Sequence, residues 1–382
     1  MKILDSLIMQ AALESKVPAG GALAVDRVLF SQYITEKIQQ HSLIEYVVDE
    51  VTAIPQFSNI NPVIIASGPL TSRPLAESIE NFLGQESLAF FDAISPIITF
   101  DSLNTDALFK QSRYDKGAGK DYWNIPLDKE QYRKFISDIN QAEKYSGNEE
   151  VEKDSLDKLR PFEGCMPIED MAARGEDTPR FGPLKPKGLR DPQSGKEPYA
   201  VMQLRQDDQE GKLWSMVGMQ TRMKRHEQQR IFCSLPGLEK AEFVRYGTVH
   251  RNTFIDSPKI ISPTLELRKY EGLFFAGQIT GVEGYVESTA SGLVAGINAF
   301  RRLNGANLLV LPKETAIGGL INYVSDQTRL HFQPMNVSYG LISEDYLIEN
   351  KENFKKMKKT VKRQLIANRA LSLIHEIKEQ IK

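Results

Sequence analysis

The amino-acid sequence predicts an α/β domain that is interrupted by an inserted α+β domain. The chain has 382 residues, which is long enough for two domains with separate cores. Helix and strand patterns alternate before about residue 90 and again after about residue 252, as they do in layered α/β folds. Between these stretches, short runs alternate apolar and polar residues, which is typical of antiparallel strands with one solvent-exposed face.

The first segment is predicted to contain two helices followed by two strands. Apolar residues from Ile3 to Ala12 recur at helical spacing, and a Pro-Ala-Gly-Gly run ends that helix. Asp26 is a good N-cap for a second helix. Residues 44–54 are predicted to form a strand, and residues 62–70 a second, buried strand that ends at Gly68.

The rest of the chain is predicted to hold the inserted strands, a returning strand and two helices. The runs AISPIITF, AVMQLRQ and LWSMVGMQT indicate inserted strands, and the acidic run at 149–154 is expected to be a solvated helix face or loop. GLFFAGQI (272–279) predicts the returning strand, which precedes a helix of small residues from about Tyr285 to Leu303. Residues 351–382 carry ten Lys or Arg against three Glu, and their amphipathic pattern favours a packed helix over a dedicated RNA arm. The expected segments are 1–90, 91–252, 253–345 and 346–382.

Composition excludes several classes of protein. The 48 Lys and Arg against 50 Asp and Glu exclude a uniformly basic nucleic-acid binder. Two cysteines cannot build a disulfide framework and suit a reducing compartment. No apolar run approaches the ~20 residues that span a bilayer, and the first segment lacks a signal-peptide pattern. These observations predict a soluble, cytoplasmic protein.

The stretch FEGCMPIEDMAARG (162–175) is the most informative local feature. Pro167 suits the first turn of a helix, two acids follow it in that turn, and Gly175 stops the helix. Cys165 is therefore expected at or just before a helix N-terminus, where unsatisfied N–H groups stabilise a thiolate, the nucleophilic form of cysteine. A buried structural cysteine fits the pattern equally well.

A glycine-rich turn between the predicted strand at 272–279 and the helix after it is the second feature. Gly277, Gly281 and Gly284 let the backbone turn close to a ligand, and the helix start favours a negative group. Small residues along the helix allow tight packing on a sheet or on a cofactor. Close helix packing alone explains the pattern about as well.

Other motifs are absent or weak. No G-x-G-x-x-G follows a strand near the start, and no Cys/His cluster has metal-ligand spacing, so no metal site is predicted. Cys233 lies between apolar residues and a Pro-Gly turn and is predicted to be part of the core. Between residues 171 and 230, basic and aromatic residues are interleaved. Such a surface suits RNA, although an ordinary mixed surface is the default interpretation.

Several stretches together resemble one family. FEGCMPIEDMAARG, RFGPLKPKGL, PYAVMQLRQDD, EFVRYGTVHRNTFI and LFFAGQITGVEGYVESTASGLVAGINA are similar to the folate- and FAD-dependent tRNA uracil-5-methyltransferases, the TrmFO family. PAGGALAVDR and SRYDKG fit as well, so the resemblance runs along the whole chain. One departure is MKRHEQQR (223–230), where Arg225 and His226 stand at the place of the family's usual Trp-Gly pair.

The resemblance implies a fold, an activity and a set of site residues. The fold is an FAD/NAD(P)-binding Rossmann-like domain of the glutathione-reductase type. The activity is transfer of a methylene group from 5,10-methylenetetrahydrofolate to C5 of the T-loop uridine in tRNA, with electrons from NAD(P)H through FAD. Membrane and DNA are not expected partners. Cys165 matches the cysteine of the family's FEGCMPIE motif and is expected to add to uracil C6. The expected cofactor-binding residues are Gly68, Gly277, Gln278, Thr280, Gly281, Glu283, Gly284 and Tyr285, and the expected contacts to RNA or to the folate tail are Lys185, Lys187 and Arg205.

The family's first βαβ unit, with its dinucleotide fingerprint and a second functional cysteine, has no counterpart before Met1. From this the sequence predicts a Rossmann-like domain that is N-terminally truncated, with weak FAD binding and no activity of the 382-residue chain alone. Two other functions stay open at this point. One is the same reaction on ribosomal RNA, and the other is a non-catalytic RNA-binding remnant.

Overall fold

The computed structural model describes residues 1–84, 88–145, 166–329, 332–344 and 357–381. The chain divides into two compact units, each of which is described by itself. Unit 1 comprises residues 1–9, 47–89 and 252–382, and unit 2 comprises residues 10–46 and 90–251. Helix α1 (Leu7–Glu14) and the two-stranded sheet of β4 (Leu88–Ile94) and β11 (Thr248–Phe254) have residues in both units.

Unit 1 is an α/β unit built on a parallel strand pair. Strand β3 (Val63–Ile65) pairs with β12 (Leu273–Phe275), so that Val63 is opposite Leu273 and Ile65 opposite Phe275. The β12 residues are fully buried. The predicted α/β layer is therefore confirmed, and its strand pair is parallel. The helices of this unit are α3 (Arg73–Leu83), α9 (Ser257–Ile260), α10 (Tyr285–Leu303), α11 (Ala316–Ser325) and α13 (Lys359–Gln380).

Helix α10 is held in unit 1 by the side chains of Asn298, which is buried, and Arg302, which is partly buried. The Asn298 amide donates to the carbonyls of Thr264 and Leu309, at 2.9 Å each, and accepts from the Leu309 N–H at 2.6 Å. At the last turn, the Arg302 guanidinium binds both carboxylate oxygens of Glu266, which is 7% exposed. Bidentate pairing of this kind satisfies both charged groups as they leave water. These contacts fix the direction of α10, and so the position of its first turn.

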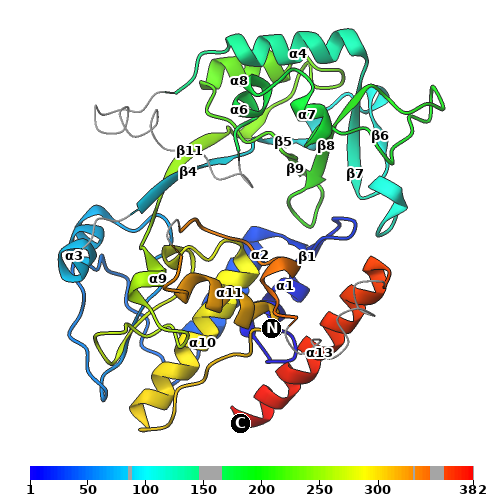
Figure 1. Ribbon diagram of the computed structural model, residues 1–382. Coiled ribbons are helices and arrows are strands. Elements are labelled where there is room, and N and C mark those ends of the chain that lie inside the picture. Colours follow the sequence, from blue (N-terminus) through cyan, green and yellow to red (C-terminus); the bar gives the residue numbers. More distant parts are fainter. Residues whose placement is uncertain (85–87, 146–165, 330–331, 345–356, 382) are drawn as a thin grey trace. The chain divides into compact units, whose positions relative to one another are not determined.

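Unit 2 is an α+β unit with a six-stranded antiparallel sheet. The strand order is β10 (Phe243–Arg245), β5 (Ile97–Thr99), β9 (Leu213–Met216), β8 (Ala200–Gln206), β7 (Tyr122–Leu127) and β6 (Phe109–Lys110). The predicted antiparallel strands are confirmed. Figure 1 shows helices α4 (Lys129–Gln141), α6 (Ile168–Ala173) and α8 (Arg225–Phe232) gathered on one side of this sheet. Among the described residues, this unit also contains β1 (Lys16–Val17), β2 (Ala24–Val25), α2 (Arg27–Gln39), α7 (Thr178–Phe181) and short 3-10 helices at 100–102, 105–107 and 113–115.

The core of unit 2 lies between α4 and the sheet. The Asp128 side chain caps α4 and forms a capping box with Gln131. The apolar face of α4 is then completely buried against sheet residues and against Phe232 of α8. The buried α4 residues are Tyr132, Phe135, Ile136 and Ile139. This packing supplies the rigid base on which the short helix α6 lies.

The structure differs from the expectations for the first segment in three respects. Residues 44–54 do not form a strand, because no described segment pairs with them, and apolar side chains such as Val48 (83% exposed) stay in solvent. Strand β3 is present but only partly buried, since Ile64 is 38% exposed. Residues 10–46 also group with unit 2 instead of with the other residues of 1–90. The reason is a set of specific contacts, including Gly20 N–H to Asp121 at 2.7 Å and Tyr122 O–H to the Ala19 carbonyl at 3.0 Å.

Candidate functional site

The carboxyl ends of the two parallel strands in unit 1 form an open edge of backbone. Gly68 follows β3 with φ +77°, and Gly277 follows β12 with φ +78°. No atom within 4 Å would meet a Cβ at Gly68, and at Gly277 only the Ser288 Cβ comes as near as 4.0 Å. Ligands of α/β sheets bind at the carboxyl ends of the strands. The predicted residues Gly68 and Gly277 are therefore placed together by the β3–β12 pairing.

The turn from β12 into α10 is locked by its own side chains. The Thr280 hydroxyl donates to the Gly277 carbonyl at 2.7 Å, and the Gln278 amide donates to Glu283 at 3.2 Å. Gly281 and Gly284 have φ of +77° and +92°, which side chains other than glycine rarely adopt. The turn is therefore preformed rather than shaped by a ligand.

The first turns of α10 leave an open surface. Tyr285 is 88% exposed, directly after Gly284. Gly292 and Gly296 have no neighbouring atom where a Cβ would stand. Gly284, Ser288, Gly292 and Gly296 are four residues apart and so follow one ridge of the helix. The Glu287 carboxylate crowds this ridge at Gly284, whereas at Gly292 and Gly296 it is bare enough for a flat ligand to approach the backbone.

The predicted helix after Cys165 is present in unit 2. Cys165 itself lies outside the described residues. Helix α6 begins at Ile168 with Pro167 as N-cap and ends before Gly175, as the sequence predicts. Met166 and Ile168 are 2% and 0% exposed, and the Ile168 N–H donates to the Gln220 carbonyl at 2.8 Å. The chain that follows the cysteine is therefore buried and fixed.

Glu169, in the first turn of α6, is a fully buried acid. Its Oε1 accepts from the Thr221 hydroxyl at 2.9 Å and from the Arg222 N–H at 2.8 Å. Its Oε2 is buried and has no hydrogen-bond partner among the described residues. Burial raises the pKa of the Glu169 carboxyl, which favours its neutral form. This burial cannot be predicted from the sequence, because acids in a first helical turn are ordinarily solvated.

The predicted basic residues of unit 2 surround a side chain that sequence reasoning missed. The Arg113 guanidinium donates to the backbone carbonyls of Lys185 and Lys187, and to the Gln203 amide oxygen at 2.9 Å. The side chains of both lysines are exposed. Arg205 lies on β8 opposite Tyr122, and its buried Nε has no partner among the described residues. The SRYDKG motif, which contains Arg113, is the sequence feature from which this functional residue could have been found.

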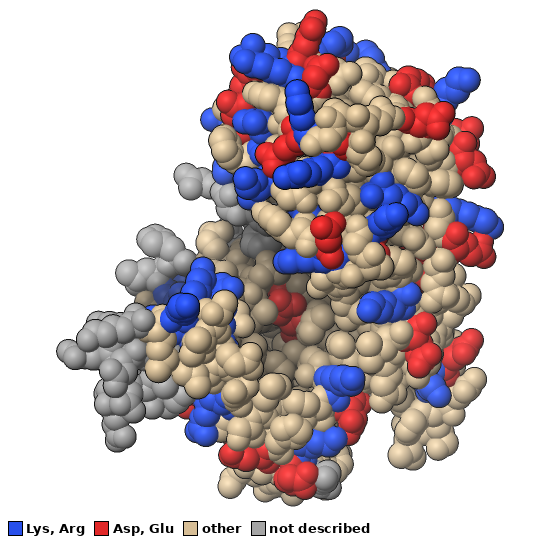
Figure 2. Space-filling model, turned by 90° about the vertical axis from the view of Figure 1, so that its right-hand side faces the viewer, with Lys and Arg blue, Asp and Glu red and all other residues tan. Residues whose placement is uncertain are grey.

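The face of the molecule drawn in Figure 2 carries mixed rather than uniformly positive charge. Figure 2 shows Lys and Arg side chains spread over the face in view with Asp and Glu side chains between them. Binding of an anion in unit 2 therefore rests on particular cations rather than on the overall field.

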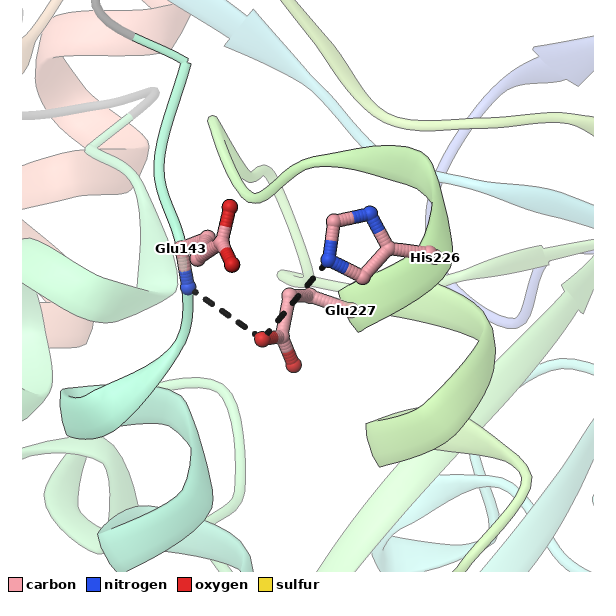
Figure 3. Close-up of side chains that lie close together, drawn as sticks. All are labelled: Glu143, His226 and Glu227. Atoms are coloured by element: carbon pink, nitrogen blue, oxygen red, sulfur yellow. Dashed lines mark hydrogen bonds and ion pairs between the residues drawn. The ribbon is translucent and has the colours of Figure 1, made fainter.

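The folded chain also brings together Glu143, His226 and Glu227, which the sequence spacing did not group (Figure 3). The Glu227 Oε1 lies 3.9 Å from the His226 Nε2 and accepts from the Glu143 N–H at 3.5 Å. Lys224 already pairs with the Glu143 carboxylate at 2.7 Å, and Arg230 pairs with that of Glu227 at 2.6 Å. Since two cations balance the two carboxylates, a metal ion gains little attraction here. We assign no metal to this cluster.

Cys233 follows α8 and packs against the core of unit 2. Burial raises the pKa of its thiol. A thiol with a raised pKa is a poor nucleophile at neutral pH, in keeping with a structural role. None of the described helices combines the length and apolar character needed to cross a membrane.

Comparison with known proteins decides the family. Residues 1–307 match the family described as glucose inhibited division protein A (GIDA). Relatives named methylenetetrahydrofolate–tRNA-(uracil-5-)-methyltransferase TrmFO match nearly the whole chain. The relatives from Natranaerobius thermophilus and Listeria monocytogenes are each 50% identical, over 100% of this chain and 84% of their own lengths. The relative from Citrifermentans bemidjiense is 51% identical over 98% of this chain and 82% of its own. The chain belongs to the TrmFO family.

The fold comparison agrees with this assignment. A solved structure of Aquifex aeolicus GidA superposes with a TM-score of 0.66 at 17% identity, covering 92% of this chain and 66% of that one. The chain thus spans about two thirds of the GidA chain. At this identity the likeness concerns the fold alone. It confirms the Rossmann-like fold with an inserted domain that the TrmFO resemblance implied.

The buried Glu169 predicts a pH dependence of stability. Because its pKa is raised above the ordinary value of 4.5, the folded chain binds this proton more tightly than the unfolded chain does. The stability that the neutral carboxyl contributes is full below that ordinary value and is lost as the pH rises through the folded-state pKa. We expect Glu169→Gln, which cannot ionise, to flatten this loss.

Urea unfolding at several pH values between 4.5 and 8.5 measures the effect. Asp170→Asn is the matched control, because this neighbouring acid of α6 is part-exposed and paired with Arg222 at 2.9 Å. A Glu169→Gln curve parallel to that of the unmodified protein would refute the expectation.

Proposed function

We propose that this chain methylates C5 of a uridine in tRNA, using 5,10-methylenetetrahydrofolate as the carbon donor and FAD as the redox cofactor. The observation that carries the proposal is the 50% identity, over the full chain, to relatives named for this reaction. The open edge at β3 and β12 and the fixed segment after Cys165 support it. A T-loop uridine as the target, NAD(P)H as the electron source and a cytoplasmic location complete the proposal.

Cys165 is the proposed nucleophile. Uracil C5 is a poor nucleophile until a group adds to C6. The thiolate forms an S–C6 bond, and the electrons of the C5=C6 bond move into an enolate, so that C5 can attack the methylene carbon. The bond from the methylene carbon to the tetrahydrofolate nitrogen then breaks as the C5 proton is lost, and tetrahydrofolate departs with the electron pair of that bond. Addition of two electrons and one proton to the resulting exocyclic methylene gives the methyl group, and expulsion of the thiolate from C6 restores the C5=C6 bond. The buried chain from Met166 to Ile168 supports this role, because it holds in place the backbone that directly follows Cys165 in the sequence.

The residues at the carboxyl edge of unit 1 fit a flavin. Gly68 and Gly277 allow close approach to the backbone, and the start of the 19-residue helix α10 favours the negative pyrophosphate. The exposed Tyr285 ring offers a flat surface for an aromatic heterocycle of the flavin or of folate. When bound, reduced FAD supplies the electrons that turn the transferred methylene into a methyl group. Gln278, Thr280 and Glu283 keep the turn in shape.

The cations of unit 2 are proposed to hold the anionic substrates. Lys185 and Lys187 present exposed ammonium groups from a backbone that Arg113 holds in place. Arg205, on β8 of the same unit, has a buried Nε–H without a partner among the described residues. RNA phosphates and the glutamate tail of folate are both anions that such groups bind.

The proposed nucleophile is tested by substitution. We expect Cys165→Ala to fold and to abolish formation of 5-methyluridine, because the variant lacks the thiolate that is proposed to add to C6. Cys233→Ser is the matched control and should keep near-normal turnover with a modest loss of stability. Mass spectrometry of nucleosides from treated tRNA measures both. Methylation by Cys165→Ala at the normal rate would disprove the assignment.

The proposed flavin site along the open ridge of α10 predicts that a methyl group added there raises stability but weakens FAD binding. We expect Gly292→Ala to stabilise α10 by about 0.5–1 kcal/mol, since glycine disfavours helix. The added methyl should also weaken FAD binding about tenfold, because steric overlap costs about 1–3 kcal/mol. Gly296→Ala, one turn farther from the glycine turn, should stabilise equally and weaken binding less. Thermal unfolding and flavin fluorescence titration provide the two readouts, and equal FAD affinity in all three proteins would contradict the placement.

The proposed RNA contacts predict a change in salt dependence. Charge reversal at Lys187 should weaken tRNA binding and reduce the slope of log affinity against log salt by about one, because one phosphate contact and its released counterion are lost. Lys129→Glu, at the exposed start of α4 in the same unit, is the control. Filter binding between 50 and 200 mM salt gives the slopes, and the same slope for Lys187→Glu as for the unmodified chain argues against this contact.

A further inference from the structure

The contacts of Glu169 reach beyond helix α6. Its Oε1 joins the first turn of α6 to the Thr221 hydroxyl and to the Arg222 N–H. The Thr221 hydroxyl oxygen in turn accepts from the Met223 N–H at 3.0 Å. The Ile168 N–H adds a parallel link to the Gln220 carbonyl. Residues 168–169 and 220–223 are therefore bound to one another along their length.

The segment at 220–223 is itself held from other directions. The Tyr145 N–H donates to the Arg222 carbonyl at 2.7 Å. The Gln228 amide donates to the carbonyls of Met223 and Gly247, at 2.7 and 2.9 Å, and accepts from the Gly247 N–H. Thr221 and Gln228 are both 0% exposed. Any movement of α6 relative to this segment would break several buried hydrogen bonds at once.

The link through the Glu169 carboxyl lowers the free energy of unfolding. One of its oxygens is buried without a partner among the described residues, and that arrangement costs stability. Costly buried ionisable groups cluster at functional sites. Glu169 stands four residues after Cys165, and Met166, the residue bonded to Cys165, is 2% exposed.

We propose that Glu169 is a positioning residue for Cys165, whose carboxyl anchors the first turn of α6 to residues 220–223 and thereby fixes the chain that leads out of the nucleophile. The inference rests on the proposed function for the identity of the nucleophile. Thr221 is the second half of the anchor. Neither residue takes part in bond making.

Hydrogen–deuterium exchange tests the anchor without any substrate. Glu169→Ala and Thr221→Val should speed exchange of the amides of 168–173 and 221–223 at least tenfold, while the amides of α4 keep their rates. Glu169→Gln and Thr221→Ser keep the acceptor and the hydroxyl, and should exchange like the unmodified chain. Glu227→Ala is the matched control, because this buried acid pairs with Arg230 instead of with residues 220–223. Should Glu169→Ala fail to fold, Thr221→Val still decides the question. Unchanged exchange at 168–173 in the variants that fold would overturn the anchor.

Steady-state methylation then tests the link to Cys165. We expect Thr221→Val to lower kcat at least tenfold with KM for tRNA within about twofold, and Thr221→Ser to restore kcat. A destabilised but correctly positioned enzyme, such as Glu227→Ala, should keep its kcat. Faster local exchange with an unchanged kcat in Thr221→Val would overturn the positioning role. If Cys165→Ala remained active, both the proposed nucleophile and the positioning role of Glu169 would be wrong. The hydrogen–deuterium exchange experiment would still decide whether the anchor between α6 and residues 220–223 exists.

Discussion

The hydrogen bonds between α6 and residues 220–223 are the constraint on which the site in unit 2 depends. Helix α6 has only six residues, too few to be stable alone. It persists because Ile168 and Glu169 bind a segment that is itself tied to Tyr145 and Gln228. That segment rests in turn on the core between α4 and the six-stranded sheet. The apolar core therefore supports the buried polar contacts of residues 220–223, and these contacts in turn hold the chain next to Cys165.

Much of the fold follows from local sequence signals. Asp26 caps α2 through the N–H groups of Val28 and Leu29, and α10 spans Tyr285–Leu303, as its pattern of small residues predicts. Residues 44–54 mislead because β-branched and apolar residues favour a strand only where a neighbouring strand supplies hydrogen bonds. Strand propensity lies in the sequence, but pairing is a property of the whole fold. The same limit explains why residues 10–46 join unit 2 through contacts to residues about a hundred positions away, such as Asp121.

The candidate site is predictable in part, and for different reasons at each residue. Gly277, Gly281 and Gly284 were found from the sequence because positive φ values select glycine directly. Arg113 was missed because it binds backbone carbonyls, which leave no trace in residue type. The burial of Glu169 cannot be predicted, because the local sequence around a first-turn acid looks the same whether the acid is solvated or buried. Glu143 and Glu227 meet only through folding, since 84 positions separate them.

The contacts of Arg113 make the folding of the loop at 185–187 independent of the chemistry of its exposed side chains. It holds that loop through backbone carbonyls, so the path of the chain does not depend on which side chains stand at 185 and 187. Both side chains point into solvent and contribute little to folding. Mutations at these two positions can therefore accumulate without a folding penalty. The chemistry of this part of the surface can therefore change during evolution while the scaffold beneath it stays the same.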